Sequence, residues 1–298
     1  MRVNPNFSAD ILQDLYQSQN QEQTTIEQMA SGTLINTPSD NPAGASALVE
    51  NQAVQSQTDQ FLQNTSGAEG LLQTADSTLS SVVSALNRAI SLGVQGGTDT
   101  VSDSDRQAIA QEVQGIQSQV VQLANVSYQG NYVFAGTLTN TAPFTLDSSA
   151  PDGVTYNGNE NTNTVEIAEG RSIQLNQPGD QIFQGSGGDV FGALQQLVTA
   201  LQNNDTNGIS AATTQLGGAL TYLSQQRVFY GNAVNQLNSN QAFLQQEQVN
   251  LQSQENSIDA VDIPSATTNL SQDQLTQSAA LAALAKVLPL SLMNYLPS

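Results

Sequence analysis

The side chains that most often carry acid–base, nucleophilic or metal chemistry are missing from this chain of 298 residues. It contains no Cys and no His, which excludes disulfides, thiolate and imidazole metal ligands, and catalytic triads built on His. Carboxylates, hydroxyl groups and six basic residues remain, and the acids are scattered along expected solvent faces. We therefore predict no catalytic residue, no cofactor and no metal site, and we do not expect an enzyme.

Two groups of oxygen-bearing residues are the best candidates for a cation site. The first comprises Asp99, Asp103 and Asp105. It lacks the spacing and terminal Glu of an EF-hand, and acids at a helix start are explained by the helix dipole. The second comprises Asp152, Asn157, Asn159 and Glu160. A hairpin turn through Asn157 and Gly158 accounts for these polar residues more simply than a metal does.

The charge balance restricts the possible partners. With 26 acids against 6 bases, the formal charge is −20, so the surface repels phosphate backbones and anionic lipids. We expect neither nucleic-acid nor membrane binding, and no stretch approaches the ~20 apolar residues of a membrane-spanning helix. The amino terminus lacks the features of a secretory signal, which fits a cytoplasmic protein or one exported without a cleaved signal.

The dominant pattern is a seam of residues at alternating steps of four and three, which predicts a helix over residues 209–258, roughly 75 Å long, with a partner helix along one edge. The seam runs through Ile209, Thr213, Leu216, Leu220, Leu223, Arg227, Tyr230, Val234, Leu237, Gln241, Leu244, Gln248, Leu251, Glu255 and Ile258. We expect the polar members of this seam to set the register of the pair.

A second rod of similar length is predicted over residues 42–92, with Pro42 at its first position and Ser39, Asp40 or Asn41 as its cap. We expect Gly93, Gly96 and Gly97 to end it. Its seam runs through Ala47, Asn51, Val54, Thr58, Phe61, Thr65, Ala68, Leu72, Ala75, Leu79, Val82, Leu86 and Ala89. The two rods are therefore expected to pair with each other.

Shorter elements lie between the rods. A third helix carries apolar residues from Ile109 to Leu123, and Ser104 with Gln107 resembles a capping box at its start. Residues 128–188 are rich in turn formers and hold short apolar runs at 132–134, 144–146, 154–156, 165–167 and 173–175. Alternation and turn signals predict a small β-rich insertion there. A short amphipathic helix follows from Asp189.

Both chain ends carry weaker seams, separated from the rods by the loop at 30–44 and by a hinge at Pro264. The amino-terminal segment is either a frayed end or a helix that orders against neighbouring subunits. The apolar stretch 279–296 needs a partner, either residues 1–35 or a multi-subunit core. The predicted assembly interface comprises Phe7, Ile11, Leu12, Leu15, Ile26, Met29, Leu270, Leu281, Leu284, Leu288 and Leu292.

Four segments, in order along nearly the whole chain, resemble the flagellin family, and its hook–filament junction proteins more closely than its filament subunits. They are residues 30–42 (ASGTLINTPSDNP), 104–110 (SDRQAIA), 131–137 (NYVFAGT), and the carboxyl-terminal pair 269–271 (NLS) and 291–296 (SLMNYL). Pro264 departs from the continuous helix that the family usually keeps there, and Pro289 is more similar to flagellins.

The resemblance implies a mainly α fold with long coiled-coil-like helical rods and a small β-rich inserted domain. It implies three parts: terminal helices 1–42 and 259–298 forming an inner assembly core, a helical rod domain 43–127 and 189–258, and an outer β-rich domain 128–188. The implied role is a structural subunit joining flagellar hook to filament; flagellin is the alternative, and a coiled-coil fibre or adhesin the third reading.

The resemblance also implies location and partners. The chain would be exported unfolded through the flagellar secretion apparatus, without a cleaved signal peptide, to the extracellular flagellum. The implied partners are further copies of the chain in a ring, the hook-side junction protein, flagellin or the filament cap, and a flagellar export chaperone.

Overall fold

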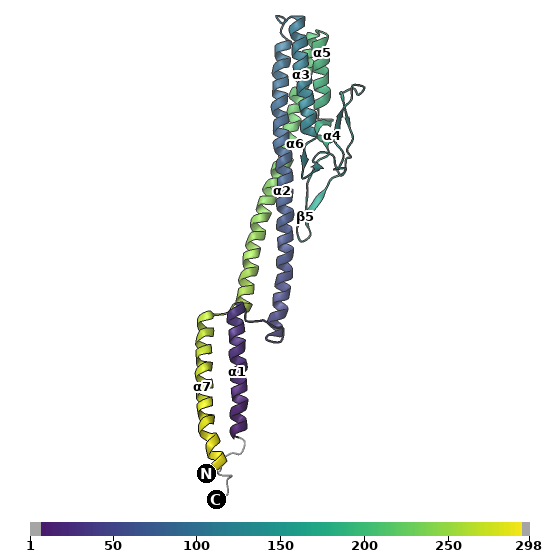
Figure 1. The fold of residues 1–298 in the computed structure, drawn as a ribbon. Coiled ribbons are helices and arrows are strands. Elements are labelled where there is room, and N and C mark those ends of the chain that lie inside the picture. The colour runs from purple at the N-terminus through teal and green to yellow at the C-terminus, as the bar shows by residue number, and fades with distance from the viewer. Residues whose placement is uncertain (1–6, 294–298) are drawn as a thin grey trace. The chain divides into compact units, whose positions relative to one another are not determined.

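Two helices of more than fifty residues, α2 (Pro42–Gly96) and α6 (Thr206–Asp259), are the longest elements of the fold (Figure 1). The computed structural model describes residues 7–293, without the side chains of residues 7–11, 284 and 286–293. The other helices are α1 (Phe7–Ser31), α3 (Asp103–Ala124), α4 (Gly179–Phe183), α5 (Val190–Gln202) and α7 (Ile263–Met293). The fold is mainly α, as the sequence predicts.

The chain divides into two compact units. The terminal unit consists of Met1–Gln57 and Glu247–Ser298, and the central unit of Thr58–Gln246. Both long helices therefore contribute one segment to each unit.

The predicted seam of α6 is confirmed with a clear heptad pattern. Every seventh residue along it is buried, with an exposed fraction between 0% and 8%: Ile209, Leu216, Leu223, Tyr230, Leu237, Leu244 and Leu251. The seam positions between them, such as Thr213 and Leu220, are half-buried. A repeat of seven residues is what a helix needs to keep one edge against a partner helix over this length.

The seam of α2 follows the same repeat but changes character along the helix. Its buried heptad positions are Asn51, Thr58, Thr65, Leu72, Leu79 and Leu86. The polar half of this series lies toward the start of α2 and the leucine half toward its end. In the leucine half a second series, including Ala75, Val82 and Ala89, is buried as well, because α3 and α5 add their apolar faces to the same core. Val54, predicted to lie in the seam, is 39% exposed.

One predicted helix end is corrected by the structure. Gly93 does not end α2, which continues to Gly96. A Cβ atom at Gly93 would lie 2.4 Å from the Thr213 hydroxyl oxygen of α6. This glycine is therefore explained by the close approach of two helices, and Gly97, whose amide bonds the Gly93 carbonyl, follows the last turn.

The predicted cap of α3 is also wrong by two residues. Ser102, not Ser104, is the N-cap, and its Oγ accepts from the Asp105 amide at 3.2 Å while donating to the Asp105 carboxylate at 2.7 Å. The capping pair is thus Ser102 with Asp105 instead of Ser104 with Gln107. Asp189 caps α5 in the same way through the Gly192 amide.

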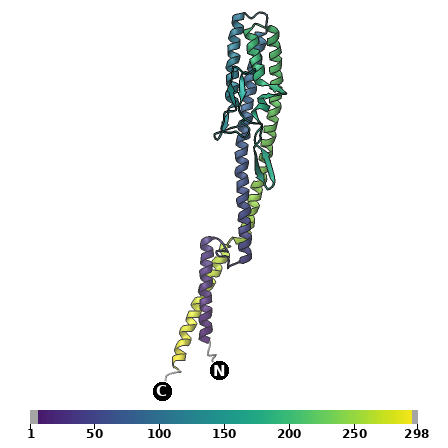
Figure 2. The same ribbon diagram turned by 90° about the vertical axis from the view of Figure 1, so that its right-hand side faces the viewer.

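The β-rich insertion consists of two-stranded antiparallel hairpins that lie on one side of the helices of the central unit (Figures 1 and 2). The strands are β1 (Ser127–Tyr128), β2 (Asn131–Tyr132), β3 (Phe144–Leu146), β4 (Val154–Tyr156), β5 (Thr164–Ala168), β6 (Arg171–Gln174), β7 (Gln184–Gly185) and β8 (Gly188–Asp189). They pair in chain order, β1 with β2 through β7 with β8. Each of the five predicted apolar runs overlaps one of the strands β2 to β6, and helix α4 is an addition that the sequence did not predict.

The turn expected at Asn157 and Gly158 is not formed, because the connection between β3 and β4 lies at residues 147–153. Instead, the Asn159 side chain ties two loops together by accepting the Thr137 amide at 2.8 Å and donating to its hydroxyl. The insertion has an aromatic core in which the rings of Phe134, Phe144, Phe183 and Phe191 contact one another at centroid distances of 5.2–5.8 Å.

Candidate assembly interface

Helices α1 and α7 pack side by side in the terminal unit, but they bury little (Figure 1). Among the described side chains of the two helices, the buried ones are Leu15, Thr25 and Ala266. The side chains of Gln274 and Glu22 join the helices by a hydrogen bond of 3.1 Å. A fully buried Leu contributes about 1.5–3 kcal/mol, so three small or medium side chains give this pair a weak core.

Several large apolar side chains of the predicted interface remain at the surface of the pair. Leu12, Ile26 and Leu281 are exposed by 45%, 47% and 50%, and Met29 and Leu270 are half-buried. Leu15 is the predicted member that is buried within the pair. The side chains of Phe7, Ile11, Leu284, Leu288 and Leu292 lie outside the described set. Their part in an interface stays a prediction.

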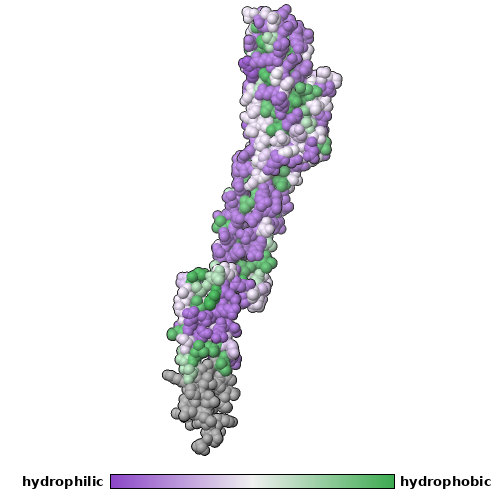
Figure 3. Space-filling view, in the orientation of Figure 1, coloured by the Kyte–Doolittle hydropathy of each residue, from purple (hydrophilic) through white to green (hydrophobic). Residues whose placement is uncertain are grey.

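Two further exposed side chains were missed by the sequence reading, Tyr16 on α1 and Leu275 on α7, with exposed fractions of 66% and 65%. Figure 3 shows hydrophobic patches, in green, on the surface that α1 and α7 form. Seam reasoning finds residues that face a partner within one chain, so it passes over large residues on the opposite side. Tyr16 and Leu275 could have been found in the sequence because each is a large side chain on a helix face otherwise made of Gln and Ser.

The segment that follows α1 and the segment that precedes α7 are joined to each other by backbone hydrogen bonds. Gly32 ends α1 with a φ of +79°, a conformation that glycine adopts without strain. Its carbonyl accepts from the Val261 amide at 3.3 Å, and Thr33 forms an isolated antiparallel bridge with Ala260. The break before α7 lies at residues 260–262, and Pro264 occupies the first turn of α7, where proline is well tolerated.

Asp259, the last residue of α6, is the main acceptor at this joint. Its carbonyl oxygen accepts from the Leu34 amide and its carboxylate Oδ1 from the Ile35 amide, both at 2.7 Å. The joint therefore fixes two consecutive residues of the loop after α1 to the end of α6. Because it carries a charge-assisted bond to backbone, it positions the end of α1 and the start of α7.

The loop that follows is organised by a second carboxylate. Asp40 accepts from the amides of Asn36 and Thr37 and from the Thr37 hydroxyl. These bonds, the Thr37 amide first, lower the pKa of Asp40 below its usual value. Asn41 then caps α2 through the Gly44 amide, and Pro42 is the first helical residue, as predicted.

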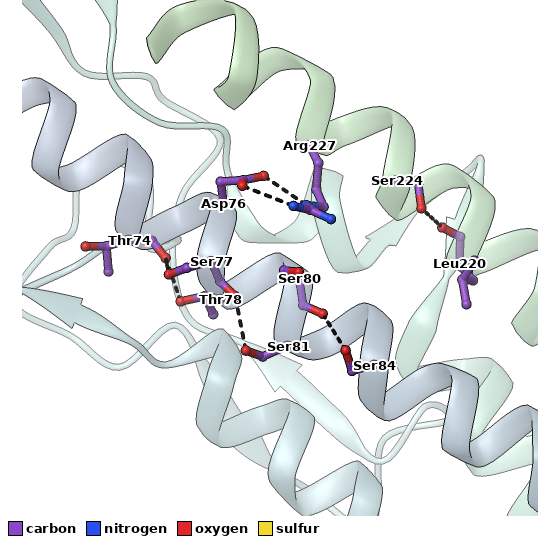
Figure 4. Close-up of polar contacts among 10 residues, drawn as sticks. All are labelled: Thr74, Asp76, Ser77, Thr78, Ser80, Ser81, Ser84, Leu220, Ser224 and Arg227. Carbon is purple, nitrogen blue, oxygen red and sulfur yellow. Dashed lines mark hydrogen bonds and ion pairs between the residues drawn. The ribbon is translucent and has the colours of Figure 1, made fainter.

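Within the central unit, an ion pair crosses from α6 to α2 (Figure 4). Arg227 Nε and Nη2 donate to the two carboxylate oxygens of Asp76 at 2.9 and 3.1 Å. The hydrogen bond to Asp76 raises the pKa of Arg227. Arg227 is thus paired across the seam, while Gln241, Gln248 and Glu255 are half-buried on the same helix.

The hydroxyl groups near this pair are engaged with their own helix. Thr78, Ser81 and Ser84 donate to carbonyl groups four residues back, as Figure 4 shows for α2. This arrangement satisfies the hydroxyl without any partner. Ser81 and Ser84 are exposed and form a neutral helix surface, whereas Thr78 is buried with its hydroxyl group satisfied in this way.

No cluster of three or more acidic residues that could hold a metal occurs among the described residues. Asp103 instead lies 3.8 Å from Arg106, and Asp105 belongs to the cap of α3. Over residues 7–293, no helix has the length and apolar character needed to cross a bilayer.

Long heptad helices, a pair of terminal helices and inserted hairpins define a class of mainly α proteins with a small β region. Two family models match the chain: the bacterial flagellin N-terminal helical region over residues 3–139 and the C-terminal helical region over residues 213–296. The chain belongs to the flagellin family.

Three relatives refine this comparison. The chain is 35% identical to flagellar hook-associated protein 3 of Salmonella typhimurium over 158 residues, which are 53% of this chain and 48% of that protein. It is 24% identical to a flagellin of Listeria innocua over 96% of this chain and 95% of the relative. The crystal structure of Bacillus cereus FlgL superposes with a TM-score of 0.61 at 26% identity, covering 70% of this chain and 99% of that one. The match to the Salmonella protein thus spans about half its length.

Proposed function

We propose that this chain is a structural subunit of the bacterial flagellum that joins the hook to the filament. The proposal rests on two similarities taken together, one of sequence and one of structure. The higher sequence identity is to a hook-associated protein 3, and the crystal structure of a FlgL is matched over almost its whole length. The flagellin relative is matched more completely but at lower identity.

The terminal unit supplies the physical reason for assembly. The pair α1–α7 leaves Leu12, Tyr16, Ile26, Leu275 and Leu281 exposed, although burying such side chains is worth about 1.5–3 kcal/mol each. Copies of the chain packed through their terminal helices remove these side chains from water. The eleven residues of the predicted interface, including those without described side chains, belong to this proposed contact.

The three-part division of the chain belongs to the same proposal. Residues 1–42 and 259–298 form the inner assembly core, residues 43–127 with 189–258 form the rod domain, and residues 128–188 form the outer domain. The joint at Asp259, which accepts from Leu34 and Ile35, lies at the boundary between core and rod in this scheme.

The proposed partners are further copies in a ring, the hook-side junction protein, and flagellin or the filament cap. The proposed route is export without a cleaved signal peptide to the extracellular flagellum, with a chaperone on the carboxyl-terminal helix. A chain free of Cys forms no disulfide before export, which supports a route that threads an unfolded chain.

The test is to locate the chain in isolated flagella with a specific antibody. A narrow band at the hook end is expected for a junction subunit. Labelling along the whole filament contradicts the proposal and favours a flagellin, which is the second candidate because of the full-length relative.

A truncation tests the role of the terminal unit. Removing residues 279–298 is expected to leave a soluble, folded central unit that does not join the flagellum. Normal motility of cells carrying this truncation as their sole copy contradicts an assembly role for the carboxyl-terminal helix.

A further inference from the structure

The sequence Asn157–Gly158 does not form a hairpin turn, and its residues keep the reactivity that is typical of an asparagine followed by glycine. The chain contains two such pairs, Asn157–Gly158 and Asn207–Gly208. In each pair the backbone nitrogen of the glycine can attack the side-chain amide of the asparagine, because no side chain on the glycine obstructs the approach. The fold decides which of the two pairs reacts.

The side chain of Asn157 is weakly held at the surface of the insertion. Asn157 directly follows strand β4 and belongs to no helix or strand. Its Nδ2 atom donates to Thr145 Oγ1 at 3.1 Å, and both residues are exposed. Because water can replace this bond at little cost, the side chain is able to turn toward the next residue.

The attacking group of this pair, the Gly158 amide, is not engaged. The Asn157 amide donates to the Pro143 carbonyl at 2.7 Å, and the Asn159 amide donates to the Ala135 carbonyl at 3.2 Å. In the part of the chain that the structure describes, no hydrogen bond has the Gly158 amide as its donor. An amide that donates must break its bond before its nitrogen reacts, and Gly158 does not face this barrier.

Packing explains why the residue after Asn157 is a glycine. A Cβ atom at Gly158 would overlap the hydroxyl end of the Tyr156 ring. That hydroxyl group donates to two backbone carbonyl groups, each at 3.1 Å, and Tyr156 pairs with Phe144 of the aromatic core. The core therefore requires the small residue that makes Asn157 reactive.

The second pair is held in a different conformation. Asn207 and Gly208 lie in the first turn of α6, which begins at Thr206, and Asn207 is exposed. Side chains of an α-helix tilt toward its amino terminus, so the Asn207 side chain is directed away from the amide nitrogen that follows it. Asn207 is thus a control within the same chain, alike in exposure but different in backbone conformation.

We propose that Asn157 is a site of spontaneous deamidation, with Gly158 as the internal nucleophile. The Gly158 nitrogen attacks Cγ of Asn157, and the new C–N bond closes a succinimide ring. The bond between Cγ and the side-chain nitrogen breaks, and that nitrogen leaves as ammonia with the proton of the Gly158 amide. Water then opens the ring at either carbonyl carbon. The product at position 157 is aspartate or isoaspartate, and each adds one negative charge to the chain.

The two products differ in their effect on the insertion. Isoaspartate adds one carbon atom to the main chain directly before Asn159, whose side chain accepts from the Thr137 amide and donates to the Thr137 hydroxyl, both at 2.8 Å. The longer main chain displaces Asn159 and weakens its bonds to Thr137. Aspartate leaves the main chain unchanged, and its carboxylate can accept from the Thr145 hydroxyl.

Peptide mass spectrometry of the folded full chain, sampled during storage in buffer, measures conversion at both pairs. Deamidation at Asn157 is expected to be at least about tenfold faster than at Asn207, because helical structure restrains only the second pair. In guanidinium chloride, where no fold distinguishes the pairs, the two rates should be similar. Equal rates in the folded chain overturn the proposal, as does an Asn157 that stays intact there while both pairs react in denaturant.

Asn157→Gln is the matched variant, because the longer side chain disfavours ring closure. It is expected to abolish conversion at position 157 and to leave the rate at Asn207 unchanged. Conversion at position 157 that continues at the original rate would show that Gly158 is not the nucleophile.

The effect on the insertion is measured by amide exchange of Thr137. Asn157→Asp reproduces one product without lengthening the main chain, so exchange at Thr137 should equal that of the unmodified protein. The isoaspartate fraction of stored protein, separated by anion exchange, should exchange at Thr137 at least about tenfold faster. Equal protection in that fraction overturns the loss of the bonds between Asn159 and Thr137. None of these outcomes depends on whether the chain joins hook and filament.

Discussion

Arg227 and Asp76 are 151 residues apart in sequence, yet both carboxylate oxygens of Asp76 accept from the guanidinium group at 2.9 and 3.1 Å. The two side chains are exposed by only 31% and 36%. A two-point contact of this kind fixes direction as well as distance. It therefore holds α2 and α6 at one relative height within the central unit, where their apolar seams meet.

The strength of this pair can be measured by a double-mutant cycle with Asp76→Ala and Arg227→Ala. We expect a coupling free energy of about 0.5–1 kcal/mol, at the upper end for partly exposed pairs because the contact is bidentate. Urea unfolding of the four proteins measures it. The pair Arg88–Glu112, exposed by 60% and 46%, is the control and should couple more weakly; the reverse order contradicts the assignment.

The leucine half of the α2 seam is expected to carry most of the stability of the central unit. Leu79→Ala removes a side chain with no exposed surface and should lower the free energy of unfolding by about 2–5 kcal/mol. Leu138→Ala, at a position 48% exposed, should change it by less than about 0.5 kcal/mol. Thermal or urea unfolding separates the two, and similar losses for both would contradict the heptad core.

Two asparagines attach the β5–β6 hairpin to the long helices. They differ in burial, so substituting each one measures how burial affects the contact. Asn240 is 4% exposed and donates to the Ile167 carbonyl at 2.8 Å, and Asn64 donates to the adjacent Glu166 carbonyl at the same distance near the surface. Asn240→Ala leaves a buried carbonyl unpaired and should cost about 1–3 kcal/mol.

Asn64→Ala is the matched change, because water can replace an exposed donor. It should cost less than about 0.5 kcal/mol in the same urea experiment. Equal costs for the two substitutions would show that the hairpin attachment is not governed by burial.

Periodicity revealed more of this fold than local chemistry did. A heptad series extends over fifty residues, so errors at single positions average out, and the positions from Ile209 to Leu251 were found with their spacing intact. The cap of α3 and the end of α2 depend on single residues, and there Ser104 and Gly93 were both misread. Ser102 is an equally suitable capping residue two positions earlier. Gly93 lies where α2 and α6 approach each other closely and does not mark the end of α2.

The insertion was located correctly, but its turns were not. Asn157 and Gly158 have the sequence of a tight hairpin turn, yet the strands pair across residues 147–153 instead. The aromatic core overrides the local preference, because Phe144 and Tyr156 pair opposite each other and pack at 5.1 Å. The exposed residues Tyr16, Phe243 and Leu275 were also missed, since seam reasoning assumes that apolar residues face inward.

The loop before α2 is expected to depend on pH through Asp40. Its hydrogen bonds lower the pKa of the folded form below 3.8, so the stabilisation is present above pH ~4 and is lost as the pH falls through the lowered value. Amide exchange or NMR shifts of Asn36 and Thr37 should follow this titration. Asp40→Asn should abolish the dependence below pH 4, and its persistence in that variant would exclude Asp40 as the cause.

The terminal helices are expected to be the least protected helices of the free chain. Among described side chains, α1 and α7 bury Leu15, Thr25 and Ala266, whereas the central unit buries whole series such as Leu72, Leu79 and Leu86. Local opening is easiest where few apolar contacts resist it. Hydrogen exchange on a dilute monomer should therefore show faster exchange in residues 12–31 and 263–283 than in α3 and α5.

Assembly should reverse this difference, because copies that cover Leu12, Ile26 and Leu281 add the contacts that the single chain lacks. The same measurement on sedimented assemblies is expected to slow exchange in the terminal helices by at least tenfold while leaving α3 and α5 unchanged. A dilute monomer whose terminal helices are protected as well as its central unit would mean that the α1–α7 pair is stable alone, and burial of its exposed leucines would then not be what drives assembly.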